Sequence, residues 1–249
     1  MAKSLRDYFT TRGQAQALGA YAAFATGSAW SVSHKMDMYD LSREAFSGAG
    51  KLEAFTRIYG NLVSSWQVFR PHSPEDCWNA ATIFEALRKE LAGFDHASGM
   101  NLINFNHQRR HSVMFSLSAL GGIKPNTAYP TMTVSKFLHF FNPSLFPIYD
   151  TAVVWNKVFA SFRGDYREYC NRTNLGPDSE GAAFLRNYIC WSSELMTTAS
   201  PDFMPSFVAW LAGELPPRRF AMLDPAFLST LYATAFEFTA IGAAKVEGF

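Results

Sequence analysis

The chain has 249 residues, of which 48% are hydrophobic and 16% aromatic, including 23 Phe. So much apolar material can build a sizeable core, which excludes an intrinsically disordered chain. The formal net charge is +1 and charged residues make up only 17%, so the composition excludes a broadly basic nucleic-acid-binding protein and leaves room only for a local basic patch.

The N-terminal part carries no targeting signal. The first residues lack the apolar segment of a signal peptide, and the apolar stretch over residues 15–25 is shorter than the ~20 residues of a membrane span. We therefore expect a cytoplasmic protein without a membrane anchor. The three cysteines, Cys77, Cys170 and Cys190, form no C-x-x-C pair. We expect buried thiols, with no disulfide scaffold, metal site or other cofactor.

Apolar residues recur at spacings of three and four through most of the chain, which is the pattern of amphipathic helices. The pattern predicts helices, in chain order, over about 55–69, 73–91, 108–120, 131 or 133 to 141, from 151 past 162, 180–196, 202–211 and 225–236. Ser73, Ser179 and Asp224 are the expected helix caps. No repeat and no strand alternation is present. The sequence therefore predicts an all-α fold: a single globular multi-helix domain over 1–249, with a division into two lobes near Gly121 as a possible variant.

One segment carries a functional pattern. From Thr133 to Val158 an apolar helix is followed by a short extended turn, Phe146 to Asp150 (F-P-I-Y-D), and a further helix. An aspartate at a helix start lies where the helix dipole favours its negative charge. A carboxylate at the rim of an apolar cleft can activate a water or stabilise positive charge on a sugar. The same position also fits a simple helix cap.

This segment resembles the helix, turn and catalytic aspartate of the helix-hairpin-helix DNA glycosylase superfamily. Upstream, residues 120–128, with Gly121, Gly122 and Lys124, resemble that family's hairpin, whose backbone amides bind a DNA phosphate. The hairpin lies several residues further from the aspartate here, so either 129–132 is an insertion or the hairpin match is accidental. The resemblance covers 120–158. Its phrase K-x-L-H-F…N-P…F-P-I-Y-D is also similar to uncharacterised bacterial proteins.

The resemblance implies roles for three side chains. Asp150 would be the key carboxylate. Lys136 corresponds loosely to the lysine with which bifunctional members attack the sugar, but it falls inside the predicted helix, which favours a monofunctional enzyme. His139 lies three residues further and could position a water or a phosphate. The alternatives are a polar helix face for Lys136 and a packed, hydrogen-bonded core histidine for His139.

The most basic cluster is Arg109 and Arg110, flanked by His107 and His111. The two arginines could contact phosphate, or they could lie on a solvated helix face. No H-E-x-x-H pattern is present, so we expect no zinc site here.

Together these patterns lead to one expectation and one rival. The first is a glycosylase-like protein of the monofunctional N-glycosylase (hydrolase) type, which cleaves the N-glycosidic bond of a base or nucleoside. Its expected catalytic residues are Asp150, Lys136 and His139. The expected phosphate or nucleic-acid contacts are Arg109, Arg110, Gly121, Gly122 and Lys124. The rival is a non-catalytic helical module of the same fold that binds nucleic acid or protein. The sequence leaves the oligomeric state open.

Overall fold

A computed structural model describes residues 3–26, 30–47, 50–105, 107–176 and 181–248, without the side chains of residues 107, 108, 110 and 111. Over these ranges the chain forms twelve α-helices and no strand, so the all-α prediction is confirmed. The α-helices are α1 (Thr11–Ala25), α2 (Val32–Phe46), α3 (Leu52–Ser64), α4 (Ala80–Glu90), α5 (His107–Ala119), α6 (Thr131–Phe141), α7 (Ala160–Arg172), α8 (Gly181–Thr197), α9 (Phe203–Glu214), α10 (Pro217–Ala221), α11 (Pro225–Leu228) and α12 (Tyr232–Val246).

Five short helical segments of other types connect them. Four are 3-10 turns, η1 (Leu5–Phe9), η2 (Pro74–Asp76), η3 (His96–Ser98) and η4 (Leu120–Ile123), and η5 (Thr151–Phe159) is a π-helix. The π-helix begins directly after Asp150 and continues into α7. Inside α7, Phe162 has a non-helical backbone (φ −121°, ψ 28°), which marks a kink. The helix predicted after Asp150 is present, but its first part is a π-helix rather than an α-helix.

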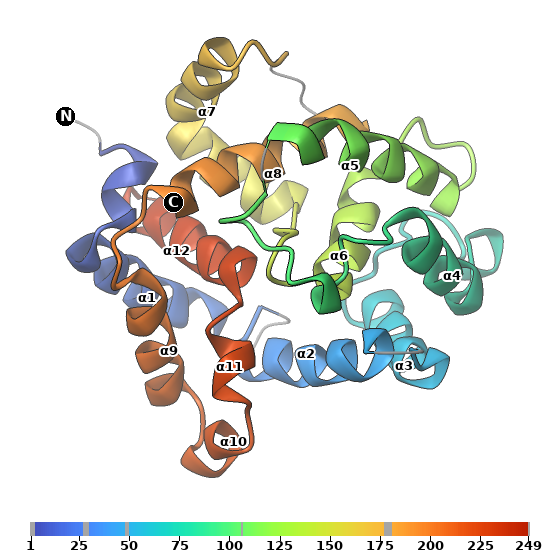
Figure 1. Ribbon diagram of the computed structural model, residues 1–249, viewed down its shortest axis with the longest axis horizontal. Coiled ribbons are helices and arrows are strands. Elements are labelled where there is room, and N and C mark those ends of the chain that lie inside the picture. The colour runs from blue at the N-terminus through green and yellow to red at the C-terminus, as the bar shows by residue number, and fades with distance from the viewer. Residues whose placement is uncertain (1–2, 27–29, 48–49, 106, 177–180, 249) are drawn as a thin grey trace.

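The helices surround one core. In Figure 1, α12 lies left of the middle, α3 and α4 lie at the right, and α9 and α10 extend at the lower left, while α11 lies beside the start of α2. Buried apolar side chains from Leu5 to Ala244 form one connected cluster, which makes the described chain a single globular domain. α1 and α12 cross very closely, because a Cβ added at Gly242 would lie 1.9 Å from the carbonyl oxygen of Ala17.

The predicted helix over 73–91 is divided in two. Ser73 makes no capping hydrogen bond, and the turn after it is the short η2. The amide of Trp78, inside the predicted helix, donates to the carbonyl of Ile123 (3.1 Å). This amide therefore bonds to a distant part of the chain and not to the preceding helical turn. Asn79 caps α4 through the amide of Thr82 (2.9 Å).

The predicted last helix is divided as well. Asp224 caps α11 through the amide of Ala226 (2.9 Å), as expected, but α11 ends at Leu228 and α12 begins at Tyr232. An amide in the first turn of α12, that of Thr234, donates to the carbonyl of Pro143 (3.2 Å). This contact anchors α12 to the segment that follows α6. The expected cap Ser179 lies outside the described residues.

Two further expectations concern the cysteines and the membrane. Cys77, Cys170 and Cys190 all lie in the described ranges, are buried, and form no disulfide. Within those ranges, no helix combines the length and the apolar character needed to cross a membrane.

Candidate functional site

Asp150 is the last residue of the F-P-I-Y-D segment, which we call the 146–150 turn. Side chains from several elements bind the backbone of this turn. α6 precedes it and is buried on nearly all sides, from Thr133 to Phe141. The predicted solvated polar face of this helix is therefore absent. Lys136 has an exposed side-chain fraction of 4% and His139 of 0%.

His139 binds the start of the turn from inside the core. Its Nδ1 lies 2.7 Å from the carbonyl oxygen of Phe146. Because a carbonyl oxygen only accepts, Nδ1 carries the hydrogen, and Nε2 accepts from the hydroxyl of Tyr39 at 2.6 Å. Burial lowers the pKa of His139 well below its usual 6.5, and the positive charge of Lys35 lowers it further. His139 is therefore a neutral, hydrogen-bonded core residue, as the alternative interpretation expected.

A buried ion pair binds the middle of the turn. Glu237 on α12 accepts from the amide of Ile148 at 2.6 Å and from the Lys35 ammonium, also at 2.6 Å. Both side chains have an exposed fraction of 0%. Burial raises the pKa of Glu237 and lowers that of Lys35, and each charge opposes the shift of the other. This pair costs desolvation, which the short contact and the amide donor offset.

The last position before Asp150 is bound by a side chain of α6. The Ser135 hydroxyl accepts from the amide of Tyr149 (3.0 Å) and lies 2.9 Å from its carbonyl oxygen. The Tyr188 hydroxyl donates to the carbonyl of Ile148 at 3.4 Å. The backbone on the N-terminal side of Asp150 is thus held at successive residues, which fixes where the aspartate side chain begins.

Asp150 caps the π-helix and forms an ion pair at the same time. Its Oδ1 accepts from the amides of Ala152 (2.9 Å) and Val153 (3.1 Å). Its Oδ2 accepts from Lys136 Nζ at 3.0 Å, and the Asp150 side chain is 15% exposed. The ammonium also lies 5.3 Å from the ring centroid of Trp66, a cation–π contact. The structure therefore brings together two of the three residues predicted for chemistry.

A small cavity of about 180 Å³ reaches Tyr149 at the end of the 146–150 turn, but neither Lys136 nor Asp150 lines it. It is lined by both sequence neighbours of Asp150, by the start of α6 and by Lys124 of the hairpin-like segment: Lys124, Tyr129, Pro130, Thr131, Met132, Thr133, Tyr149 and Thr151. The volume lies below the ~300–1,000 Å³ of typical ligand pockets. The cavity can therefore receive a small ring or part of a sugar, and the rest of a larger ligand would remain outside it.

The hairpin-like segment is a 3-10 turn packed against aromatic rings. A Cβ at Gly122 would lie 2.9 Å from the Trp78 ring, and one at Gly121 would lie 3.3 Å from Tyr129. Lys124 is 8% exposed, and its ammonium donates to the carbonyl of Arg70 at 2.9 Å. Burial lowers the pKa of Lys124. These contacts explain why glycine occupies both positions, while phosphate binding by this segment stays a prediction.

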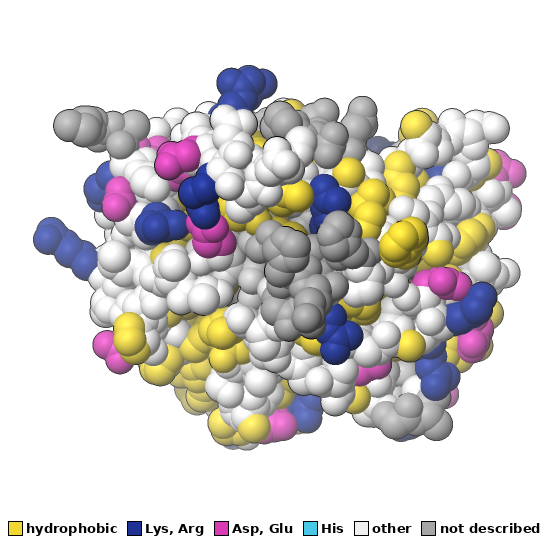
Figure 2. Space-filling view, turned by 45° about the horizontal axis from the view of Figure 1, so that its top comes forward, with side chains coloured by type: hydrophobic (Ala, Val, Ile, Leu, Met, Phe, Trp, Pro, Cys, Tyr) yellow, Lys and Arg dark blue, Asp and Glu magenta, His cyan; other side chains and the backbone are white. Residues whose placement is uncertain are grey.

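Of the basic cluster, Arg109 has a described side chain. Arg109 is on the exposed side of α5, with its guanidinium 5.9 Å from the ring centroid of Phe94. The side chain of Arg110 lies outside the described residues. On the face shown in Figure 2, Lys and Arg side chains are scattered among Asp and Glu and form no continuous basic field. Phosphate contact by the two arginines stays a prediction.

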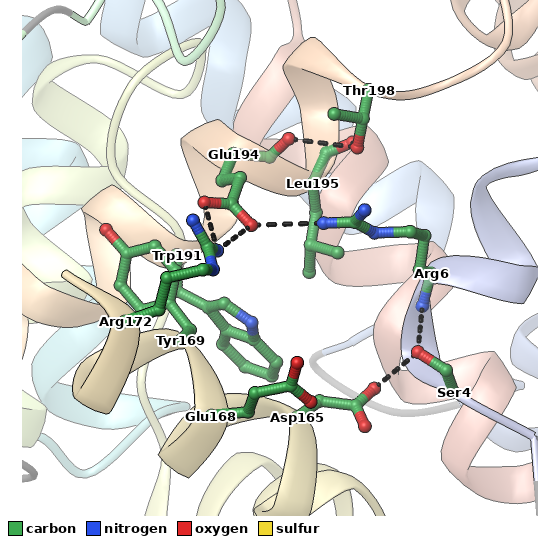
Figure 3. Close-up of a pocket in the computed structure, with 10 residues that line it drawn as sticks. All are labelled: Ser4, Arg6, Asp165, Glu168, Tyr169, Arg172, Trp191, Glu194, Leu195 and Thr198. Atoms are coloured by element: carbon green, nitrogen blue, oxygen red, sulfur yellow. Dashed lines mark hydrogen bonds and ion pairs between the residues drawn. The ribbon is translucent and has the colours of Figure 1, made fainter.

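A larger cleft of about 680 Å³ lies between η1, α7 and α8. Figure 3 shows Arg6 and Arg172 reaching the same carboxylate, Glu194, above the ring of Trp191. Their Nη2 atoms lie 3.0 and 2.5 Å from Glu194 Oε1. On the opposite wall, Asp165 accepts from the Ser4 hydroxyl at 2.8 Å. These pairs tie the N-terminal turn to α7 and α8.

The sequence did not identify Lys35, Tyr39 and Glu237 as site residues. Glu237 binds the turn and Lys35, and Tyr39 binds His139, all inside the core. One signal was present: Glu237 is the only charged residue between positions 232 and 244. A lone acid in an apolar helix indicates a buried charge that needs a partner. Nothing in the local sequence identifies Lys35 as that partner, because the contact spans 202 positions of the chain.

Comparisons with protein-family models, with curated proteins and with solved structures find no match to this chain. Among the described residues, no group of three or more His, Cys, Asp or Glu side chains is arranged to hold a metal ion.

Proposed function

We propose that the protein is a glycosylase-like hydrolase that cleaves the N-glycosidic bond of a base or nucleoside, with Asp150 as its key carboxylate and Lys136 as its partner. The observation that carries the proposal is the 3.0 Å contact between Lys136 Nζ and Asp150 Oδ2. It joins two of the three side chains to which the resemblance assigns chemistry, although they lie 14 positions apart. A helix-hairpin-helix arrangement around residues 120–158 is part of the same proposal.

In the proposed reaction, the bond between the sugar C1′ and the base nitrogen breaks, and its electron pair leaves with the base. The Asp150 carboxylate faces the positive charge that develops on the sugar. A water oxygen bonds to C1′ and gives a proton to the carboxylate, while the base nitrogen takes up a proton from solvent. Lys136 orients the carboxylate and forms no bond to the sugar, which makes the enzyme monofunctional.

The charge balance and the cavity both favour a small substrate. With a formal net charge of +1, the chain offers little of the phosphate neutralisation on which tight binding of long duplex DNA depends. The cavity lined by Tyr149 and Thr151 is about 180 Å³, which suits one ring rather than a longer ligand. A nucleoside or a short strand is therefore the substrate class that we propose.

One observation favours the second candidate, a non-catalytic binding module. Both carboxylate oxygens of Asp150 already have partners within the protein, two amides on Oδ1 and an ammonium on Oδ2. A carboxylate so engaged can serve as a helix cap alone. The two candidates differ in one measurable respect, because only the first makes Asp150 necessary for base release.

The test is base release from a panel of nucleosides and short oligonucleotides with modified bases, measured for the wild type and Asp150→Asn. Asparagine preserves size and capping but removes the negative charge that pairs with the buried Lys136, so we expect activity to be lost and the melting temperature to fall. The folded fraction is therefore measured at the assay temperature, and rates are compared per folded molecule. Asp95→Asn is the matched control, because Asp95 caps η3 through the amide of Ser98 (2.7 Å). Activity equal in the wild type and Asp150→Asn, or absent from the wild type, would favour the binding module.

A further inference from the structure

A second, chemically different cleft lies between α2, η3 and α11. Its volume is about 410 Å³, within the ~300–1,000 Å³ of small-molecule sites. It is lined by Ser42, Arg43, Phe46, Ser47, His96, Ala97, Asp224, Ala226, Phe227 and Thr230. None of these residues lines the cavity beside Asp150, so the cleft has no part in the proposed glycosylase site.

The walls of this cleft are largely apolar. Phe46 and Phe227, which are 8% and 4% exposed, contribute ring edges, and Ala97 and Ala226 add methyl groups at the surface. Apolar walls with a few polar groups are the usual composition of a small-molecule pocket. By contrast, the arginines of the larger cleft in Figure 3 are already bound to Glu194.

Two polar side chains at the cleft have hydrogen-bonding groups without a partner among the described residues. Arg43 uses one nitrogen, Nη2, to bind Asp224 Oδ2 at 3.0 Å, and its guanidinium lies 4.8 Å from the Phe227 ring centroid. A guanidinium has five N–H donors, so donors remain for a ligand. The His96 ring stands perpendicular to the same Phe227 ring at 5.1 Å, and no hydrogen bond to it occurs among the described residues.

The charge state of these groups indicates an uncharged ligand. Burial lowers the pKa of His96, and the neighbouring Arg43 lowers it further while Asp95 opposes the shift. A neutral imidazole has one donor and one acceptor nitrogen. The charge of Arg43 is balanced by Asp224, and Asp95 adds a negative charge nearby, so no excess positive charge is present to hold an anion.

We propose that this cleft binds a small, uncharged aromatic molecule whose edge carries a hydroxyl. The ring would lie against Phe46, Phe227 and the two alanines. The hydroxyl of the ligand would donate to the unprotonated ring nitrogen of His96. It would accept from an N–H group of Arg43 that is not bound to Asp224. An apolar ring alone would leave these polar groups desolvated and unpaired, which costs binding free energy.

The experiment compares three probes by NMR titration of the full chain: phenol, toluene and benzoate. We expect phenol to bind more tightly than toluene by about two- to tenfold, the effect of one net hydrogen bond. Benzoate should bind more weakly than phenol because the cleft has no excess positive charge. His96→Phe retains an aromatic ring but removes both nitrogens, so it should weaken phenol at least twofold and leave toluene nearly unchanged. The Arg43 N–H groups would retain part of the preference for phenol.

A second variant separates the cleft from the rest of the surface. Ala226→Phe places a large side chain at the cleft and should weaken all three probes at least tenfold, whereas the same substitution at the exposed Ala212 of α9 should have no effect. Melting temperatures monitor folding of each variant. Phenol no tighter than toluene on the wild type, or phenol binding that survives His96→Phe and Ala226→Phe unchanged, would overturn the proposal.

Discussion

At the scale of single residues, some parts of the candidate site were predictable from the sequence and others were not. The Asp150 cap was predictable because an aspartate after an extended turn has a local signature. The buried pair of Lys35 and Glu237 was not, because its partners come from α2 and α12. Such charges are recognised only once the fold brings the two helices together.

The neutral state of His139 leads to a prediction about pH. In the unfolded chain a histidine takes up a proton near pH 6.5, whereas burial holds the pKa of folded His139 well below that value. The unfolded state therefore binds more protons below about pH 6.5, and the free energy of unfolding should fall as pH falls, by at most about 1.4 kcal/mol per pH unit for one histidine. His34 and His96, whose pKa values burial also lowers, contribute in the same direction.

Urea unfolding of the wild type and His139→Asn between about pH 8 and pH 5 isolates this effect, because the other titrating groups are common to both proteins. The variant should be less stable at the upper pH, where the hydrogen bond to Phe146 is intact in the wild type. It should then lose less stability on acidification. Parallel pH dependences for the two proteins would show that His139 titrates normally.

At the scale of elements, α6 and the 146–150 turn act as one unit. The start of α6 at Thr131, its end at Phe141 and the helical segment after Asp150 were predictable from apolar spacing and from the Asn142-Pro143 pair. The divided helices were not. Their breaks depend on tertiary hydrogen bonds, from Trp78 to Ile123 and from Thr234 to Pro143, which leave no local sequence signal.

Ser135 is the element-scale residue whose removal we expect to be most informative. Its hydroxyl contacts both the amide and the carbonyl of the buried Tyr149. Ser135→Ala should therefore lower the free energy of unfolding by about 1–3 kcal/mol, the cost of leaving buried polar groups unpaired. Ser116→Ala is the control, since the exposed Ser116 hydroxyl contacts only a carbonyl of its own helix at 3.4 Å. Chemical denaturation in which both variants match the wild type would contradict this role.

At the scale of the whole molecule, the crossing of α1 and α12 fixes the centre of the fold. Gly242→Ala would place a methyl group 1.9 Å from the Ala17 carbonyl oxygen, so we expect a loss of about 1–3 kcal/mol or more from overpacking. Gly19→Ala in α1 is the matched control. Nothing lies within 4 Å of its added Cβ, and it should stabilise the protein by about 0.5–1 kcal/mol. Thermal or urea unfolding with equal stabilities for the two variants would contradict the close crossing.

The charge distribution of the whole molecule is the reason for proposing a small substrate. The whole chain is nearly neutral, and the charged side chains visible in Figure 2 are of both signs and scattered. Any binding to nucleic acid should therefore be weak and should fall with added salt. Arg109→Ala with Arg110→Ala should reduce both the affinity and its salt dependence, measured by fluorescence anisotropy with a labelled oligonucleotide. Tight binding that salt leaves unchanged would be inconsistent with this charge distribution.

The most direct test of the proposed reaction centre is the rate of base release by four proteins: the wild type, Asp150→Asn, Lys136→Met and the double variant. The proposed reaction places the sugar opposite Asp150, so the Asp150 variant should lose about a hundredfold or more in rate. Lys136 acts through Asp150, so Lys136→Met should lose less, and the double variant should be no slower than Asp150→Asn. Equal rates for the wild type and Asp150→Asn, in samples with the same folded fraction, would contradict the assignment and leave Asp150 as a helix cap.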